Sequence, residues 1–90
     1  MNKLQLFNDK TVRTHWDAKN EEWYFSVVDV VAILTDSQNP AAYWRKLKQR
    51  LRDEGNETVT ICHGLKMQAA DGKMRMTDVL NTEGVLRLVQ

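Results

Sequence analysis

The residues best placed to do chemistry in this chain are basic side chains concentrated in one short stretch. Residues 40–52 contain no Asp or Glu and five cations: Arg45, Lys46, Lys48, Arg50 and Arg52. The net charge of this stretch is +5, whereas residues 1–39 and residues 53–90 each carry −2, so the total of +1 conceals one strongly positive segment. Such a density of Lys and Arg attracts phosphates and predicts a surface that binds a polyanion. The alternative is an ordinary solvated helix, but solvated helices usually mix both signs because i,i+4 pairs of opposite charge stabilise them.

The other reactive side chains form no pattern that supports catalysis. His15 and His63 lie far apart in the sequence and, with Cys62, would give at best an incomplete metal site. Cys62 and His63 are neighbours on an expected strand, where adjacent side chains point to opposite faces, so they cannot act as nucleophile and base. Asp29 is better explained as part of a helix cap, and Asp78 could lie near a helix start. We therefore expect no enzyme activity, no metal and no cofactor.

Length and composition indicate one small domain over residues 1–90. The apolar content of 42% is ordinary for a globular protein, and no apolar run approaches the roughly 18 residues of a membrane span. The single cysteine cannot form an internal disulfide, which fits a reducing cytoplasm. No signal peptide is recognisable, so we expect a cytoplasmic protein without membrane contact. Because the chain ends at Gln90 inside an expected helix, we expect it to be the N-terminal part of a longer protein.

The basic stretch carries the local signals of an amphipathic helix over residues 40–52. Pro40 suits the first helical position because its missing N–H would be unpaired there, and Asn39 is a good cap before it. Helical spacing of roughly 100° per residue then separates an apolar stripe from the cations. The stripe consists of Trp44, Leu47 and Leu51, with Tyr43 at its edge and Lys48 beside it.

A shorter helix over residues 27–34 is expected directly before the basic one. Ser26 to Asp29 resembles a capping box, and apolar residues follow at helical spacing. The β-branched content of 27–31 would also suit a strand, but the cap and the polar residues 35–38 favour a helix. A short helix, a connection of about five residues and a basic helix have the outline of a helix-turn-helix, in which the second helix enters the major groove.

Alternating patterns predict strands around these helices and hence an α+β fold with a small antiparallel sheet. Three short strands would form a meander over residues 3–7, 11–16 and 23–25. Residues 57–63 alternate in β-formers and predict a further strand, after which Gly64 would mark a bulge or a bend.

The last third of the chain predicts a β-hairpin followed by a C-terminal helix. The two arms, residues 66–70 and 73–77, turn at Asp71-Gly72, and Asn81 caps the last helix. Three methionines on the hairpin are expected to fill the core: Met67, Met74 and Met76.

The candidate DNA-contacting residues lie on the basic helix and on this hairpin. We expect base edges to be met by Arg45, Lys46 and Gln49, and phosphates by Lys48, Arg50 and Arg52. The hairpin could touch phosphates as a wing through Lys66, Lys73 and Arg75. An ordinary hairpin with solvated cations is an equal alternative.

Several segments resemble the N-terminal domain of the BRO family. They are Trp23-Tyr24-Phe25-Ser26-Val27-Val28-Asp29-Val30, the Asn39-Pro40 opening of the basic helix, and Met76-Thr77 with Asn81-Thr82-Glu83-Gly84-Val85-Leu86-Arg87-Leu88. The resemblance spans essentially residues 3–90 and rests on many moderately informative positions. It implies a nucleic-acid-binding module of viral or prophage regulators, such as baculovirus repeated open reading frame proteins, phage antirepressors and DNA-damage-inducible proteins.

Two functions are expected as alternatives. The first is the DNA-binding domain of a phage or prophage transcriptional regulator of the antirepressor type, which contacts duplex DNA through residues 40–52. The second is a protein-interaction module that binds a repressor or another acidic partner. A homodimer, or an association through swapped contacts, is also expected, because a last helix that is cut short would leave Val85, Leu86 and Val89 incompletely covered.

Overall fold

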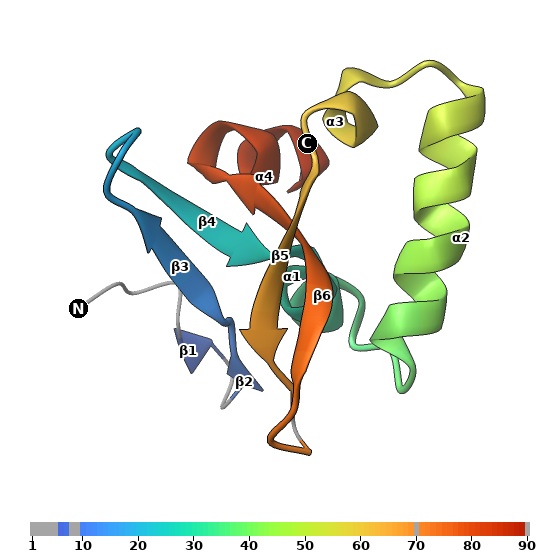
Figure 1. The fold of residues 1–90 in the computed structure, drawn as a ribbon. Helices are drawn as coiled ribbons and strands as arrows, with labels where there is room; N and C mark the ends of the chain where they lie inside the picture. Colours follow the sequence, from blue (N-terminus) through green and yellow to red (C-terminus); the bar gives the residue numbers. More distant parts are fainter. Residues whose placement is uncertain (1–5, 8–9, 70, 90) are drawn as a thin grey trace.

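The computed structural model describes residues 6–7, 10–69 and 71–89 of the chain. Its helices and strands form an α+β domain, as the sequence predicts (Figure 1). In chain order they are β1 (Leu6–Phe7), β2 (Lys10–Thr11), β3 (Thr14–Asp17), β4 (Glu22–Ser26), α1 (Val27–Thr35), α2 (Pro40–Asp53), α3 (Glu57–Thr60), β5 (His63–Gln68), β6 (Met74–Asn81) and α4 (Thr82–Val89).

Four antiparallel strands form the main sheet in the order β3-β4-β6-β5. The last strand in sequence therefore lies inside the sheet, with Leu80 opposite Phe25 of β4 and Thr77 opposite Leu65 of β5. β1 and β2 pair only with each other. The expected three-stranded meander is thus wrong, because only β3 and β4 belong to the main sheet. Residues 3–5 of its first strand lie outside the described residues.

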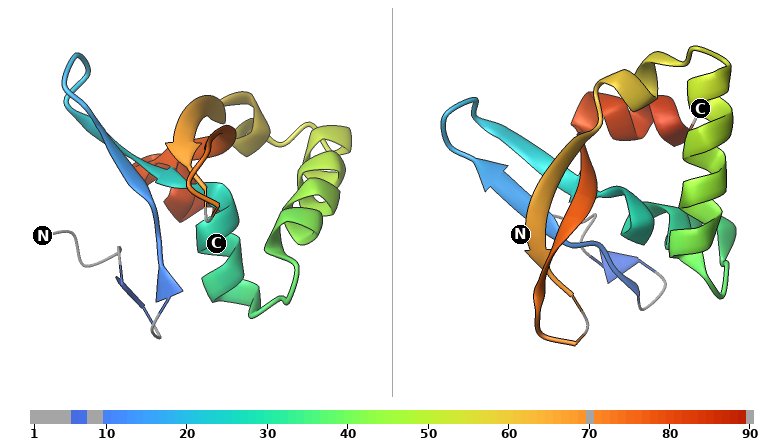
Figure 2. Two further views of the ribbon diagram at one scale, coloured as in Figure 1. Left: turned by 60° about the horizontal axis from the view of Figure 1, so that its bottom comes forward. Right: turned by 45° about the vertical axis from the view of Figure 1, so that its right-hand side comes forward.

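The helices are arranged so that α1 lies between α2 and α4. α1 and α4 both pack against β4 and β6, while α2 packs against α1 and α3. Figure 1 and Figure 2 show α2 at the opposite side of the molecule from the β3–β4 hairpin. The buried core cluster contains Val27 and Val31 of α1, Trp44 of α2 and Leu80 of β6. α2 is therefore an outer helix that contributes one fully buried side chain, Trp44, to the core.

No helix among the described residues is long and apolar enough to cross a membrane.

Side-chain caps start three of the helices, as the sequence predicts. Ser26 Oγ accepts a hydrogen bond from the Asp29 N–H at 3.4 Å, and Asn39 Oδ1 accepts one from the Ala42 N–H at 3.2 Å. For α4, Asn81 Oδ1 accepts from the backbone N–H three residues later at 2.9 Å. These caps satisfy N–H groups that have no partner within the helix.

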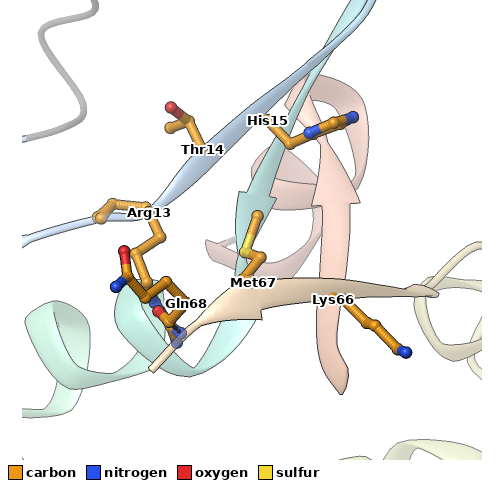
Figure 3. Close-up of a pocket in the computed structure, with 7 residues that line it drawn as sticks. Arg13, Thr14, His15, Lys66, Met67 and Gln68 are labelled. Atoms are coloured by element: carbon orange, nitrogen blue, oxygen red, sulfur yellow. Dashed lines mark hydrogen bonds between the residues drawn. The ribbon is translucent and has the colours of Figure 1, made fainter. Parts of the chain in front are cut away.

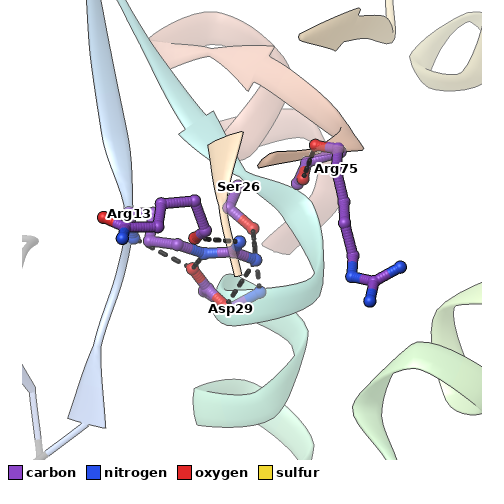
Figure 4. A network of polar contacts seen from close by, with 6 residues as sticks. Arg13, Ser26, Asp29 and Arg75 are labelled. Carbon is purple, nitrogen blue, oxygen red and sulfur yellow. Dashed lines mark hydrogen bonds and ion pairs between the residues drawn. The ribbon is translucent and has the colours of Figure 1, made fainter. Parts of the chain in front are cut away.

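The second half of the expected capping box does not form, because Arg13 takes its place. The Ser26 N–H donates to the Arg13 carbonyl at 3.0 Å, and the Asp29 carboxylate accepts from the Arg13 N–H and Nε at 2.9 and 2.8 Å. Figure 4 shows this network at the start of α1, with Arg75 pointing away from it. Since the Arg13 N–H bonds to a side chain instead of a strand, the strand expected over 11–16 is interrupted between β2 and β3.

Arg13 also bridges the two edges of the sheet. β3 and β5 border a polar hollow of about 530 Å³, and Arg13 Nη1 donates across it to the Gln68 carbonyl at 3.1 Å. Met67 extends into this hollow, whereas Lys66 extends to the opposite side of β5 (Figure 3). The four strands therefore form a curled sheet whose open side is held by one side chain.

The strand expected over residues 57–63 is wrong in its first half. Residues 57–60 form the short helix α3, and Asn56 Oδ1 accepts from the Thr58 N–H at 2.8 Å. Thr58 is buried with 4% exposure. A helix cap and burial thus override the β-branched alternation of this segment, and the strand begins only at His63.

Two expectations about the β5–β6 hairpin are also wrong. Gly64 pairs with Asp78 in an unbroken register, so it marks no bulge. A Cβ on Gly64 would lie 3.0 Å from Met76 Cε, so the methionine side chain occupies the space above this glycine. Met67 is buried as expected, but Met74 and Met76 are 60% and 66% exposed, because their part of β6 extends beyond the helices.

Candidate nucleic-acid interface

The basic helix is oriented as its amphipathic pattern predicts. Trp44 is buried with 3% exposure, Leu47 and Leu51 are half-buried against the core, and Tyr43 at the edge is 45% exposed. Five polar side chains of α2 that were expected on the outer face are exposed: Arg45, Lys46, Gln49, Arg50 and Arg52. The orientation follows from burial of the apolar stripe, which leaves the cations in water.

One carboxylate on β6 fixes α2 to the sheet. Asp78 Oδ2 accepts hydrogen bonds from Trp44 Nε1 at 2.8 Å and from Lys48 Nζ at 2.9 Å. Asp78 therefore lies within β6, four residues before the first residue of α4. Lys48, expected to meet phosphate, instead forms a partly buried ion pair within the domain. No local sequence signal pointed to this anchor, because its partners are 34 and 30 residues away.

These hydrogen bonds also lower the pKa of the Asp78 carboxyl. Burial raises the pKa of its carboxyl, but hydrogen bonds from Trp44 and Lys48 and the nearby cations outweigh burial, so the pKa lies below its ordinary value. Arg52 is one of these cations.

The depressed pKa of Asp78 predicts a loss of stability in acid. A carboxyl whose folded pKa is lowered stabilises the protein above its unfolded pKa of about 3.9, and this contribution is lost as pH falls through the folded pKa. The free energies of unfolding of wild type and Asp78→Asn should therefore converge below about pH 4. Urea unfolding of both proteins between neutral pH and pH 3 would measure this, and a constant difference over the whole range would contradict it.

The exposed cations of α2 form two rows. Helical spacing places Arg45 and Arg52 on the same side as Lys48, toward β6, because the three are separated by three or four residues. Lys46 and Arg50 lie on the other side and border a shallow groove with Tyr43. Within the described part of the chain, no ion pair involves the four cations Arg45, Lys46, Arg50 and Arg52.

The remaining residues that are expected to contact DNA differ in whether their side chains already bond to a carboxylate of the domain. Gln49 Nε2 donates to Asp53 Oδ1 at 3.0 Å, and Arg75 Nη2 forms an ion pair with Asp71 Oδ2 at 2.6 Å. Lys66 and Lys73 are exposed on the hairpin. Figure 1 shows the hairpin tip at the same end of the molecule as the start of α2. The hairpin cations thus lie toward the end of the domain where α2 begins, whereas Arg50 and Arg52 lie in the last turn of α2, at the other end of that helix.

The sequence neighbours Cys62 and His63 have different surroundings in the structure. The His63 ring packs edge-on against Tyr24, with ring centroids 5.7 Å apart. Burial raises the pKa of the Cys62 thiol to about 11, so it remains protonated near neutral pH. Among the described residues, no group of three or more His, Cys, Asp or Glu side chains could hold a metal ion.

Fold and surface together define a small α+β domain with a curled antiparallel sheet, a helical pair and one strongly basic outer helix. The family model for the BRO family, N-terminal domain, matches residues 11–90. The chain therefore belongs to this family, as the resemblance of its segments indicates. No curated protein and no solved structure matches the chain.

Proposed function

We propose that the chain is a DNA-binding domain that contacts duplex DNA through the exposed face of α2. The observation that carries this proposal is the group of four exposed cations on α2, Arg45, Lys46, Arg50 and Arg52, which form no ion pair with the described part of the domain. Unpaired Lys and Arg gain more from a phosphate than cations that already have a carboxylate partner. The apolar stripe holds this face outward.

The dimensions of α2 suit the major groove. A helix of 14 residues is about 21 Å long, and the major groove of B-DNA is about 12 Å wide and admits one α-helix. The connection from α1 to α2 spans residues 36–39, which is short enough for a helix-turn-helix-like pair. Arg45 and Lys46 in the first half of α2 are then placed for base edges, and Arg50 and Arg52 for phosphates.

The β5–β6 hairpin supplies a second contact in this proposal. Lys66, Lys73 and Arg75 would meet phosphates beside the groove that α2 enters, as a wing does. Lys48 contributes indirectly, because its pair with Asp78 holds α2 against β6. Membership of the BRO family supports a role in a phage or prophage transcriptional regulator of the antirepressor type, which would act in the cytoplasm.

The proposal predicts binding to duplex DNA with a strong dependence on salt. If about four phosphates are neutralised, the slope of log K against log salt should be on the order of −3 to −4. Fluorescence anisotropy with random and phage-derived duplexes at several salt concentrations would measure the affinity and this slope. Affinity that is unchanged between low and moderate salt, or no binding at low salt, would contradict the proposal.

An acidic protein partner, such as a repressor, is the second candidate. The observation in its favour is the same group of four exposed cations on α2, because carboxylates can pair with Lys and Arg as phosphates do. Both candidates are electrostatic and weaken with salt, so salt dependence alone does not separate them. A competition experiment separates the two candidates, because unrelated duplex DNA displaces a DNA ligand from α2 but leaves a specific protein complex intact.

A further inference from the structure

The exposed cations of α2 leave the helix in different directions, which the geometry of an α-helix fixes. Each residue is rotated by about 100° from the one before it, so Arg50 and Arg52 lie about 200° apart around the axis of α2. Arg45 and Lys46 point between these two directions, on the outer face opposite the apolar stripe. A single strand of nucleic acid that runs along one side of α2 therefore meets Arg50 or Arg52, but not both.

The side of α2 that carries Arg50 is a shallow groove with its own hydrogen-bond donors. Its volume is about 310 Å³, and it is lined by four residues at helical spacing: Tyr43, Lys46, Leu47 and Arg50. Leu47 is half-buried, whereas Tyr43 is 45% exposed. Among the described residues, no side chain bonds to the Tyr43 hydroxyl or to the two cations. The groove thus offers a phosphate one neutral and two charged donors.

The side of α2 that carries Arg52 also presents a free cation. The carboxylate on this side, Asp78, already accepts hydrogen bonds from Trp44 and Lys48. Arg52 is exposed and forms no ion pair within the part of the chain that the structure describes. Both sides of the helix can therefore bind a phosphate.

Two cations on opposite sides of one helix fit a ligand that has a strand on each side. A helix with its side chains is about 10–12 Å across, and the major groove of B-DNA is about 12 Å wide and lies between two phosphate backbones. The major groove of duplex RNA is too narrow for side chains to read. The directions of Arg50 and Arg52 therefore favour B-form DNA over duplex RNA and over a single strand.

We propose that α2 lies along the major groove with Tyr43 and Arg50 against one strand and Arg52 against the other. The Tyr43 hydroxyl donates a hydrogen bond to a phosphate of the Arg50 strand, which fixes the position of the helix without reading a base. Arg45 and Lys46 then point to the floor of the groove. This inference rests on the proposed binding of duplex DNA by α2, and it adds Tyr43 and the assignment of each side to a strand.

The first test compares variants on a duplex that the wild-type protein selects from a random library. Tyr43→Phe removes an uncharged donor, so binding should weaken about tenfold at every salt concentration. Arg50→Ala and Arg52→Ala should each weaken binding and also flatten the salt slope by about one. Tyr24→Phe is the matched control, because the Tyr24 hydroxyl donates to Glu22 within the domain, and it should change the affinity by less than about twofold.

Methylphosphonate substitution assigns each contact to a strand, because it removes the charge of a single phosphate. At a phosphate that binds Arg50, the substitution weakens binding of the wild type but not of Arg50→Ala. The phosphates identified in this way for Tyr43→Phe and Arg50→Ala should lie on one strand, and those for Arg52→Ala on the other. Duplex RNA of the same sequence should bind at least about tenfold more weakly than the DNA.

The outcomes separate this inference from the proposed function. Contacts of Arg50 and Arg52 on the same strand, or equal effects of Tyr43→Phe and Tyr24→Phe, would overturn the inference while DNA binding by α2 stands. A flattened salt slope for Tyr43→Phe, or equal affinity for duplex RNA, would overturn it too. If the wild-type protein selects no duplex, the proposed function is wrong and the inference falls with it.

Discussion

A protein with Arg45→Ala, Lys46→Ala and Arg50→Ala together is expected to fold normally and to bind duplex DNA at least about a hundredfold more weakly than wild type. Loss of a base-edge contact costs about 1–3 kcal/mol, and each lost phosphate contact lowers the salt slope by about one. The three side chains are exposed and form no ion pair with the described residues, so their removal should change the stability by only about 0.5 kcal/mol each. Anisotropy titrations and thermal unfolding measure the two effects.

The matched control removes the same charge from the hairpin. A protein with Lys66→Ala, Lys73→Ala and Arg75→Ala should retain more affinity, because these residues are proposed only to touch phosphates. Arg45→Ala alone should relax the sequence preference at one position, which a phosphate contact would not do. If the α2 variant folds and binds with unchanged affinity while the hairpin variant does not bind, the hairpin is the reading element and the proposal for α2 is wrong.

Trp44→Ala is expected to lower the free energy of unfolding by about 3–5 kcal/mol, which is a large share of the stability of a small domain. Trp44 fills the space between α2 and the core, and its indole N–H donates to Asp78. Truncation would create a cavity and leave the carboxylate with only Lys48 as a side-chain partner. Urea unfolding followed by circular dichroism measures the loss.

Two further variants distinguish packing from the hydrogen bond. Trp44→Phe keeps much of the apolar volume but lacks the N–H, so it should cost about 1–3 kcal/mol. Tyr43→Ala removes a neighbouring aromatic ring that is 45% exposed and should cost much less than Trp44→Ala. If Trp44→Ala and Tyr43→Ala destabilise the protein equally, the indole is not the anchor of α2.

Features of this fold that depend on neighbouring residues could be predicted from the sequence. Asn39 and Pro40 identify the start of α2, Ser26 that of α1 and Asn81 that of α4, because a cap bonds to an N–H only two or three residues away. The outward face of α2 also follows from spacing alone. Because helical spacing separates the cations from the apolar stripe, the sequence alone also identifies the exposed cations of the candidate site.

Features that depend on distant partners could not be predicted in this way. The position of β6 between β4 and β5 joins residues more than fifty apart, and the alternation within each strand does not specify it. Lys48 was expected to face phosphate because its partner Asp78 is distant in sequence. The helix at 57–60 depends on burial of Thr58, which competes with the β-propensity of the same residues.

The anchoring of α2 by Asp78 has a consequence for the newly made chain. The carboxylate that holds α2 follows the end of that helix at Asp53 by 25 residues, which a ribosome adds in about 1–5 seconds. During that interval residues 40–52 are already synthesised, but Trp44 and Lys48 lack their shared partner. Formation of α2 and its attachment to the sheet are therefore separate events, because the helix cannot take its final position until β6 has supplied the carboxylate of Asp78.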